Sequence, residues 1–128
     1  MSDPLVLIIE DDPLSMKLVR DVLTLSGCRT LCATSAEEGV DLARLHRPDV
    51  VVLDIGLPGM DGHAALGVLR ADRETAPAWV IAVTAGPQSD ASRFLQEGFD
   101  DFLAKPIDVH ELARRVRSVA AGAGRGPA

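Results

Sequence analysis

The sequence predicts a single α/β domain built on a parallel β-sheet. Five short runs rich in Val, Ile, Leu and Ala alternate along the chain with segments whose apolar residues recur at helical spacing. Apolar strands separated by amphipathic helices are typical of a parallel sheet that helices cover on both faces. The chain has 128 residues, 47% of them hydrophobic, which suits one core. We expect one domain over residues 1–128, with its core at about 5–120 and a flexible Gly- and Ala-rich tail at 121–128.

The first strand and helix are marked by clear start and stop residues. The expected strand at residues 5–9 runs directly into three acidic residues. Pro13 then opens a helix, with Asp12 as the expected N-cap, because a carboxylate can accept from the free N–H groups of the first turn. Gly27 ends this helix. Its expected apolar face consists of Leu14, Leu18, Val22 and Leu25.

The next two strand–helix units follow the same pattern. Residues 28–34 form the second expected strand, and a capping box at residues 35–38 opens a helix that stops before Pro48. The third strand, at residues 49–54, is followed by a loop rich in Gly and Pro and by a helix that reaches about residue 72. The residues expected to point inward from these two helices are Val40, Ala43, Leu66 and Leu69.

The last two units are shorter. The fourth strand, at residues 79–84, is followed by a helix at about 89–97 that Gly98 ends. The fifth strand, at residues 101–104, precedes a helix that starts with a D-x-x-E pattern at residues 108–111. The residues expected to be buried on these two helices are Phe94, Leu95, Val109, Leu112, Ala113, Val116 and Val119, and those expected to stay outside are Arg114, Arg115 and Arg117.

Charged and hydroxyl side chains follow the ends of four of these strands. Right-handed crossovers leave few sheet topologies, of which the flavodoxin-like order 2-1-3-4-5 is one. In that order the first and third strands are neighbours, so Glu10, Asp11 and Asp54 are expected to converge at one edge of the sheet. Thr84 ends the fourth strand and Lys105 follows the fifth, so both belong to the same edge.

This set of residues suits a divalent metal and a phosphoryl group. Close carboxylates repel one another unless a cation lies among them, and Mg²⁺ prefers carboxylate oxygens. A carboxylate can attack a phosphoryl group, while an ammonium and a hydroxyl can hold its oxygens. Each residue alone has a structural interpretation, since Asp often caps a turn and Thr favours strands. The conjunction of all of them on separate strand ends favours the functional interpretation.

Composition excludes several other classes of protein. The net charge of −6 and the pI of about 4.9 argue against direct binding of nucleic acid. Cys28 and Cys32 would lie about 13 Å apart in a strand, too far for a disulfide, so we expect buried, reduced thiols and a cytoplasmic protein. No apolar run approaches the ~20 residues of a membrane-spanning helix, so we expect no membrane contact.

With these motifs in place, the chain resembles the receiver domains of two-component response regulators from about residue 5 to residue 120. The motifs that carry the resemblance are Ile8-Ile9-Glu10-Asp11-Asp12, Asp54-Ile55-Gly56-Leu57-Pro58-Gly59-Met60-Asp61-Gly62, Val83-Thr84-Ala85 and Lys105-Pro106. The resemblance implies a CheY-like form of the flavodoxin-like fold, with five parallel strands in the order 2-1-3-4-5 and five flanking helices.

The resemblance also implies a role for each site residue. Asp54 would accept a phosphoryl group, and Thr84 and Lys105 would contact the phosphoryl oxygens. Phe102 occupies the position of the family's aromatic switch residue. The cofactor would be Mg²⁺, with Mn²⁺ as a substitute. The implied metal ligands are Glu10 through a water, Asp11, Asp54 and the backbone carbonyl of Gly56.

The function implied by the resemblance is signalling by protein contact. The phosphoryl group would come from a phosphohistidine of a histidine kinase or phosphotransfer protein. A downstream protein would bind the face formed by the helix at 89–97, the strand at 101–104 and the last helix. The protein would be a monomer or a weak phosphorylation-dependent dimer, and would catalyse only its own phosphorylation and dephosphorylation. The first strand and helix look most like single-domain regulators of the DivK type and receivers of hybrid kinases.

Three alternatives were weighed against this interpretation. The chain could be a receiver module cut from a hybrid histidine kinase or another phosphorelay protein. A phosphatase of the haloacid dehalogenase type needs a second Asp two residues after the nucleophile, where this chain has Gly56. A nucleotide-binding Rossmann domain needs a G-x-G-x-x-G loop after the first strand, which is absent. Gly56 and Gly86 leave no side chains flanking the site, so the sequence leaves the dephosphorylation rate open.

Overall fold

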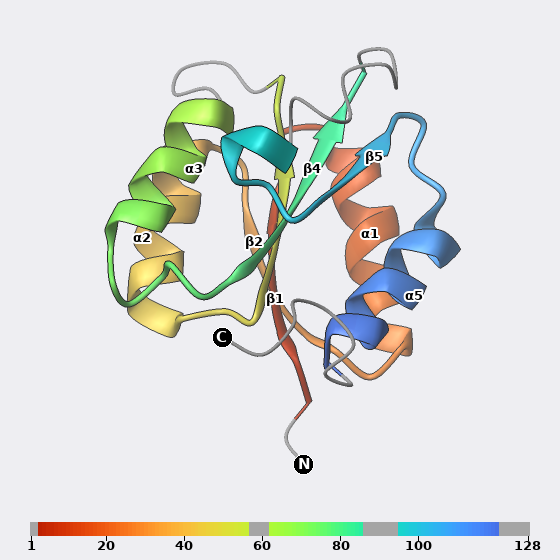
Figure 1. Ribbon diagram of the computed structural model, residues 1–128. Coiled ribbons are helices and arrows are strands. Elements are labelled where there is room, and N and C mark those ends of the chain that lie inside the picture. The colour runs from red at the N-terminus through yellow and green to blue at the C-terminus, as the bar shows by residue number, and fades with distance from the viewer. Residues whose placement is uncertain (1–2, 57–61, 86–94, 121–128) are drawn as a thin grey trace.

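The computed structural model describes residues 3–56, 62–85 and 95–120, which form a parallel sheet between two layers of helices (Figure 1). All strand pairs are parallel, and the strand order is β2-β1-β3-β4-β5. The strands are β1 (Leu5–Ile9), β2 (Arg29–Ala33), β3 (Val50–Asp54), β4 (Trp79–Thr84) and β5 (Asp101–Ala104). The predicted fold class and strand order are confirmed.

The helices cover both faces of the sheet. They are α1 (Pro13–Leu25), α2 (Ala36–His46), α3 (Gly62–Ala71) and α5 (Val109–Ala120). Helices α2 and α3 lie on one face, and α1 and α5 lie on the other (Figure 1). The helix predicted at residues 89–97 is described only over 95–97, which are helical, and its remaining residues, Phe94 among them, lie outside the described part of the chain.

The sheet separates two aliphatic clusters of buried side chains. Successive residues of a strand point to opposite faces, so each inner strand contributes to both clusters. The strand residues on the α2 and α3 side include Leu7, Ile9, Val51, Leu53, Val80 and Ala82. Those on the α1 and α5 side include Val6, Ile8, Val50, Val52, Ile81 and Val83. Burial on both faces explains why the inner strands read as continuous apolar runs.

Side-chain caps define where the helices begin. The Asp12 carboxylate accepts from the backbone N–H of Ser15 at 3.0 Å, as predicted for an N-cap. The capping box of α2 has the Glu38 N–H donating to the Ser35 hydroxyl oxygen at 3.1 Å, while the Glu38 carboxylate accepts from the residue before Ser35. Asp108 accepts from two N–H groups in the first turn of α5 at 3.1 Å. The capped ends of α1 and α5 lie beside the carboxyl ends of β1 and β5.

The predicted apolar face of α1 is wrong. Leu14, Leu18 and Leu25 are 65%, 49% and 87% exposed, and Val22 is only partly buried. The residues that α1 buries are Met16, Val19 and Leu23. The helix carries two apolar rows that both satisfy a helical period, and only the contact with the sheet selects one of them.

Three further expectations about exposure also fail. Cys32 is exposed and lies on the edge strand β2, whereas Cys28 is buried, and both thiols are free. Leu95 is exposed, and the buried apolar residue of this segment is Phe99, which follows the turn at Gly98 (φ 110°). Arg115 does not stay outside, since it is partly buried against β5.

Candidate functional site

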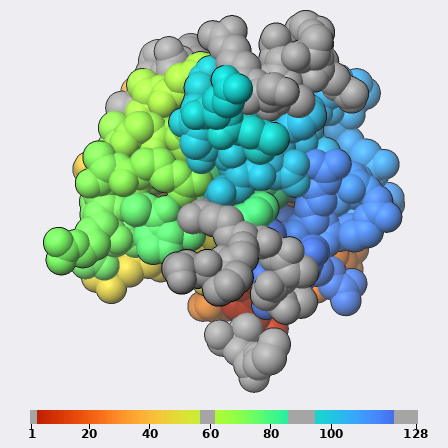
Figure 2. Space-filling model, viewed as in Figure 1, coloured from red at the N-terminus to blue at the C-terminus, as the bar shows by residue number. Residues whose placement is uncertain are grey.

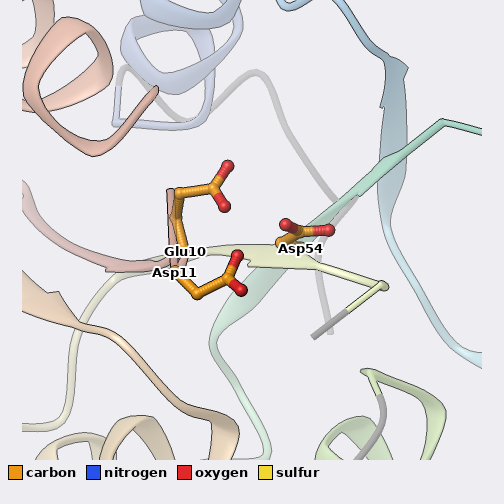
Figure 3. Close-up of side chains that lie close together, drawn as sticks. All are labelled: Glu10, Asp11 and Asp54. Atoms are coloured by element: carbon orange, nitrogen blue, oxygen red, sulfur yellow. The ribbon is translucent and has the colours of Figure 1, made fainter. Parts of the chain in front are cut away.

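Three carboxylates converge where β1 and β3 end (Figure 3). β1 and β3 are neighbours in the sheet, so Glu10, which follows β1, lies beside Asp54, the last residue of β3. Glu10, Asp11 and Asp54 each offer an oxygen within 4.8 Å of the others. Glu10 is 4% and Asp54 is 5% exposed, whereas Asp11 is open to solvent. The predicted convergence of the three acids is therefore present.

The ammonium group of Lys105 reaches this cluster from the end of β5, two strands away from β3. Lys105 follows β5, and its Nζ lies 2.9 Å from Asp54 Oδ2 and 3.5 Å from Glu10 Oε1. Its backbone N–H donates to the carbonyl of Thr84 at 2.8 Å, which holds the end of β5 against the end of β4. The second Asp54 oxygen, Oδ1, accepts from the Gly56 N–H at 2.9 Å. Both oxygens of Asp54 thus have a donor.

The pKa values of the two buried carboxyl groups of the cluster, Glu10 and Asp54, are shifted in opposite directions. Burial, together with the hydrogen bond and charge of Asp54, raises the pKa of Glu10 from 4.5 to about 7. Burial also opposes ionisation of Asp54, but hydrogen bonds from Lys105, Glu10 and Gly56 outweigh it and lower the pKa of Asp54. At neutral pH the cluster therefore contains an ionised Asp54 beside a carboxyl group that readily holds a proton.

The donor set fits a hard divalent cation. All the ligand atoms that the three acids offer are carboxylate oxygens, which Mg²⁺ and Mn²⁺ prefer. Lys105 supplies a single ammonium to a cluster of three carboxyl groups, and burial together with the neighbouring Asp54 raises the pKa of Glu10. A cation among these oxygens would favour the ionised form of the carboxyl groups.

Thr84 and Phe102 lie on the two strands next to the cluster. Thr84 ends β4 and is buried, one residue after Val83, the partner of Asp54 in the β3–β4 register. Phe102 lies in β5 opposite Ala82, and its side chain is partly buried against the α2 and α3 cluster. Ala85 is exposed, and Gly86 lies outside the described residues. The structure thus brings every predicted site residue in the described part of the chain to one region of the sheet.

An apolar hollow beside the site was not predicted. It has a volume of about 140 Å³ and lies next to Lys105. Its lining residues are Ser15, Leu18, Val19, Lys105, Pro106, Ile107 and Val109. Leu18, which lines this hollow, was predicted to lie in the core, so the sequence did not predict this surface. The exposed apolar row of α1, which includes Leu14 and Leu18, is the sequence signal that could have indicated this hollow.

Comparisons with known proteins identify the class of this fold and site. The family model of the response regulator receiver domain matches residues 6–117, and the chain belongs to that family of two-component signalling proteins. Among curated proteins, the polar-differentiation response regulators DivK of Brucella ovis and of Brucella abortus strain 2308 are each 40% identical to it over 114 residues. The alignment covers 88% of this chain and 93% of either DivK protein.

Solved structures of receiver domains have the same fold. The receiver domain of the Francisella response regulator 1452 superimposes with a TM-score of 0.86 at 28% identity, covering 94% of this chain and 98% of its own. The receiver domain of the sensor histidine kinase PA1611 from Pseudomonas aeruginosa was solved with a magnesium ion in its active-site cleft. It superimposes with a TM-score of 0.81 at 31% identity, covering 91% of this chain and 96% of its own.

None of the helices in the described part of the chain has the length and apolar character needed to cross a bilayer.

Proposed function

We propose that this protein is a response regulator that accepts a phosphoryl group on Asp54 from a phosphohistidine of a histidine kinase or phosphotransfer protein. The observation that carries the proposal is the ionised, buried Asp54, held by Lys105 Nζ at 2.9 Å beside two further carboxylates. A lowered pKa keeps this carboxylate ionised and available as a nucleophile.

The transfer needs one bond to form and one to break. An oxygen of Asp54 attacks the phosphorus, the P–N bond to the partner's histidine breaks, and the imidazole that leaves takes up a proton from solvent. Lys105 can hold one phosphoryl oxygen as a point charge, and the hydroxyl of Thr84 can donate to another.

The metal site forms part of the proposal. Mg²⁺, when bound, would neutralise the charge that develops on the transferring oxygens, and Mn²⁺ could replace it. The proposed ligands are Asp11, Asp54, the backbone carbonyl of Gly56 and, through a water, Glu10. The donor chemistry of the three carboxylates and the magnesium ion in the PA1611 receiver domain support this assignment.

The signal is proposed to leave through protein contact at the face formed by the segment before β5, β5 itself and α5. Figure 2 shows this face, where residues 95–104 lie between α3 and α5. Thr84 and Phe102 act as the switch, because Thr84 lies on β4, between Asp54 and this face, and Phe102 lies on β5 in the face itself. The protein would act as a cytoplasmic single-domain messenger over residues 1–128, monomeric or weakly dimeric when phosphorylated, with a downstream protein as its target and no substrate besides its own phosphoryl group.

A second candidate is a receiver module of a hybrid histidine kinase or another phosphorelay protein. The 31% identity to the receiver domain of sensor histidine kinase PA1611 favours considering it. The length of the open reading frame that encodes this chain distinguishes the two candidates, since a hybrid kinase adds a histidine-bearing domain.

Mass spectrometry after incubation with a small phosphodonor and Mg²⁺ tests the proposed function. We expect one phosphoryl adduct, lost in Asp54→Asn and retained in Asp12→Asn, which changes an adjacent acid whose carboxylate caps α1. An adduct that persists at Ser or Thr in Asp54→Asn would refute the assignment of Asp54.

A further inference from the structure

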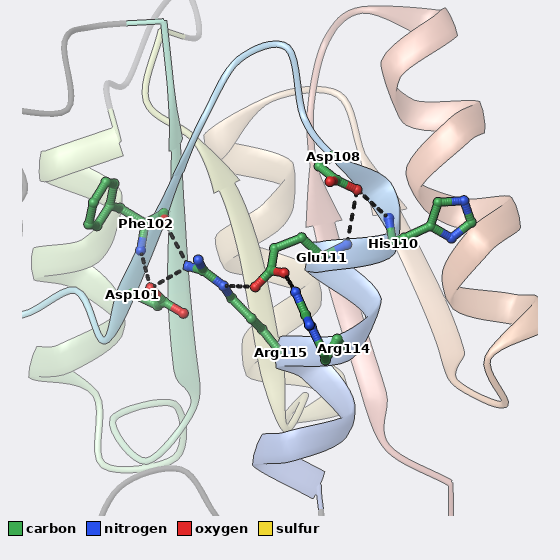
Figure 4. Close-up of polar contacts among 7 residues, drawn as sticks. All are labelled: Asp101, Phe102, Asp108, His110, Glu111, Arg114 and Arg115. Atoms are coloured by element: carbon green, nitrogen blue, oxygen red, sulfur yellow. Dashed lines mark hydrogen bonds and ion pairs between the residues drawn. The ribbon is translucent and has the colours of Figure 1, made fainter.

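The side chain of Arg115 in α5 donates a hydrogen bond to the backbone of Phe102, the proposed switch residue (Figure 4). Its Nη1 donates to the carbonyl of Phe102 at 2.9 Å and to Asp101 Oδ1 at 2.8 Å. The same Asp101 oxygen accepts from the backbone N–H of Phe102 at 2.8 Å. One guanidinium therefore holds the carbonyl of Phe102 directly and its N–H through Asp101.

The guanidinium is itself held firmly. Its Nε donates to Glu111 Oε2 at 2.9 Å, one turn earlier on α5, and the Arg115 side chain is only 34% exposed. The side chains of Asp101 and Glu111 are 26% and 24% exposed, so all three groups are partly screened from solvent. The planar fork of an Arg side chain can satisfy these three acceptors at once, which a Lys ammonium with one nitrogen cannot do in the same geometry.

The ring of Phe102 is left out of this network. Figure 4 shows the ring pointing away from Arg115, and it packs against the α2 and α3 cluster. Three residues further along the chain, Lys105 contacts Asp54 at 2.9 Å. A continuous path of contacts therefore runs from Asp54 through Lys105 and β5 to Arg115 and α5.

We propose that Arg115 is a positioning residue for the switch, which fixes the backbone of Phe102 on α5 so that phosphorylation moves the ring and transmits the change to α5. The inference rests on the proposed phosphorylation of Asp54. Arg115 lies at the other end of β5 from the phosphoryl site and does not contact Asp54, so its removal should leave phosphoryl acceptance intact while weakening the transmission.

The test compares Arg115→Ala with Arg114→Ala. Arg114 is the neighbouring Arg of the same helix and also pairs with Glu111, but its side chain is 75% exposed. Within the described part of the chain it forms no ion pair or hydrogen bond with Asp101 or Phe102, so it controls for charge and for the loss of one partner of Glu111. In Arg115→Ala we expect the amide of Phe102 to exchange about tenfold faster, because Asp101, the acceptor of that amide, loses its charge-assisted hydrogen bond to Arg115. We also expect the beryllofluoride-dependent change in amide protection of α5 to disappear. Arg114→Ala should match the wild type in both measurements.

A conservative variant keeps the test decisive if Arg115→Ala unfolds. Arg115→Lys retains the charge beside Asp101 but not the fork, and should show an intermediate Phe102 exchange rate and a reduced response of α5. A wild-type response in Arg115→Lys, or equal behaviour of Arg115→Ala and Arg114→Ala, would overturn the inference while leaving the role of Asp54 intact. Failure of the wild-type protein to bind beryllofluoride or a phosphoryl group would instead refute the proposed function.

Discussion

Glu10 and Asp54 lie at the same sheet edge, are equally buried, and yet have pKa values displaced in opposite directions. The asymmetry comes from their donors. Each carboxyl group accepts from one backbone N–H, that of Asp12 for Glu10 and that of Gly56 for Asp54. Lys105 Nζ, however, is 2.9 Å from Asp54 but 3.5 Å from Glu10, and the hydrogen bond between the two carboxyl groups raises the pKa of Glu10 and lowers that of Asp54. A small difference in position thus decides which carboxyl group can serve as the nucleophile.

The raised pKa of Glu10 predicts how the stability of the metal-free protein varies with pH. Between pH 4.5 and about 7, Glu10 is protonated in the folded state but ionised in the unfolded chain. The contribution of Glu10 to the free energy of unfolding therefore falls as the pH rises through this window. Glu10→Gln removes the titration and should raise the free energy of unfolding at pH 8 by roughly 1–3 kcal/mol, with little change at pH 4. Urea unfolding in the presence of EDTA measures both values.

The exposed Asp41 provides the control for that experiment. Asp41→Asn should change the free energy of unfolding by less than about 0.5 kcal/mol at either pH. An equal gain at pH 4 and pH 8 in Glu10→Gln would contradict the proposed cause, because a benefit that does not depend on pH cannot come from titration.

Gly39 of α2 allows close packing on β1. A Cβ at this position would lie 2.3 Å from Ile9 Cδ1 and 2.7 Å from Ile9 Cγ1, and Ile9 is fully buried. We expect Gly39→Ala to lower the free energy of unfolding by about 1–3 kcal/mol through overpacking. Gly67→Ala, on α3 with nothing within 4 Å, should instead gain up to about 1 kcal/mol from helix propensity. Denaturant titration of the two variants distinguishes these effects, and a neutral Gly39→Ala would show that Ile9 can repack.

The two apolar rows of helix α1 differ in burial and in the surface that they contact. One row packs on the sheet, and the other leaves Leu14 and Leu18 exposed, with Leu18 beside Lys105 and the segment that leads into α5. A phosphohistidine must come within bonding distance of Asp54, so the partner that carries it must also cover the surface around Lys105. The exposed row is the apolar part of that surface.

Leu18→Ala should therefore separate the two sources of phosphoryl groups. We expect the kcat/KM for phosphotransfer from a cognate kinase or phosphotransfer protein to fall about tenfold, as for loss of one buried Leu contact at an interface. Labelling by a small phosphodonor should not change, because it needs no protein contact. Leu25→Ala, at the distant end of α1, is the matched control. A loss of labelling by the small donor would mean that the substitution distorts the site instead.

The sequence predicted the strands and caps well because both are local. Apolar runs ended by Asp54 or Thr84 define strands, and Asp12 caps a helix in whatever context it occurs. The site followed from strand order, which the handedness of crossovers restricts. The rotation of α1, the exposure of Cys32 and the contact of Arg115 with β5 depend on which segments meet in space, and no periodicity within one segment encodes that.

At the scale of the whole molecule, the sheet order places the acid cluster next to one side of the molecule. β1 and β3 are central, and only β4 and β5 lie between Asp54 and the edge near α5. Contacts run along this route through Thr84, Lys105 and Phe102, whereas β2 and α2 lie on the other side of the cluster. A conformational change that starts at Asp54 should therefore spread through β4 and β5 toward α5, and not into β2 and α2.

Amide exchange with and without beryllofluoride measures that direction. We expect protection to change mainly between residues 85 and 111 and to stay constant in β2 and α2. Thr84→Ala should still take up a phosphoryl group at Asp54 but lose the distant change. Without the Thr84 hydroxyl, the phosphoryl group loses the contact through which it would favour the signalling conformation of the protein. A response confined to the loop after Asp54 would contradict this mechanism.

The contact between Arg115 and β5 also bears on how copies of this protein behave at high concentration. An edge strand with open N–H and C=O groups is a template onto which another chain can add, and such addition is difficult to reverse. β5 has only four residues, and both backbone groups of Phe102 are already engaged by Asp101 and Arg115. At high concentration the β5 edge should therefore not accept a strand from another copy, and contacts between copies on this side should form through side chains and come apart again.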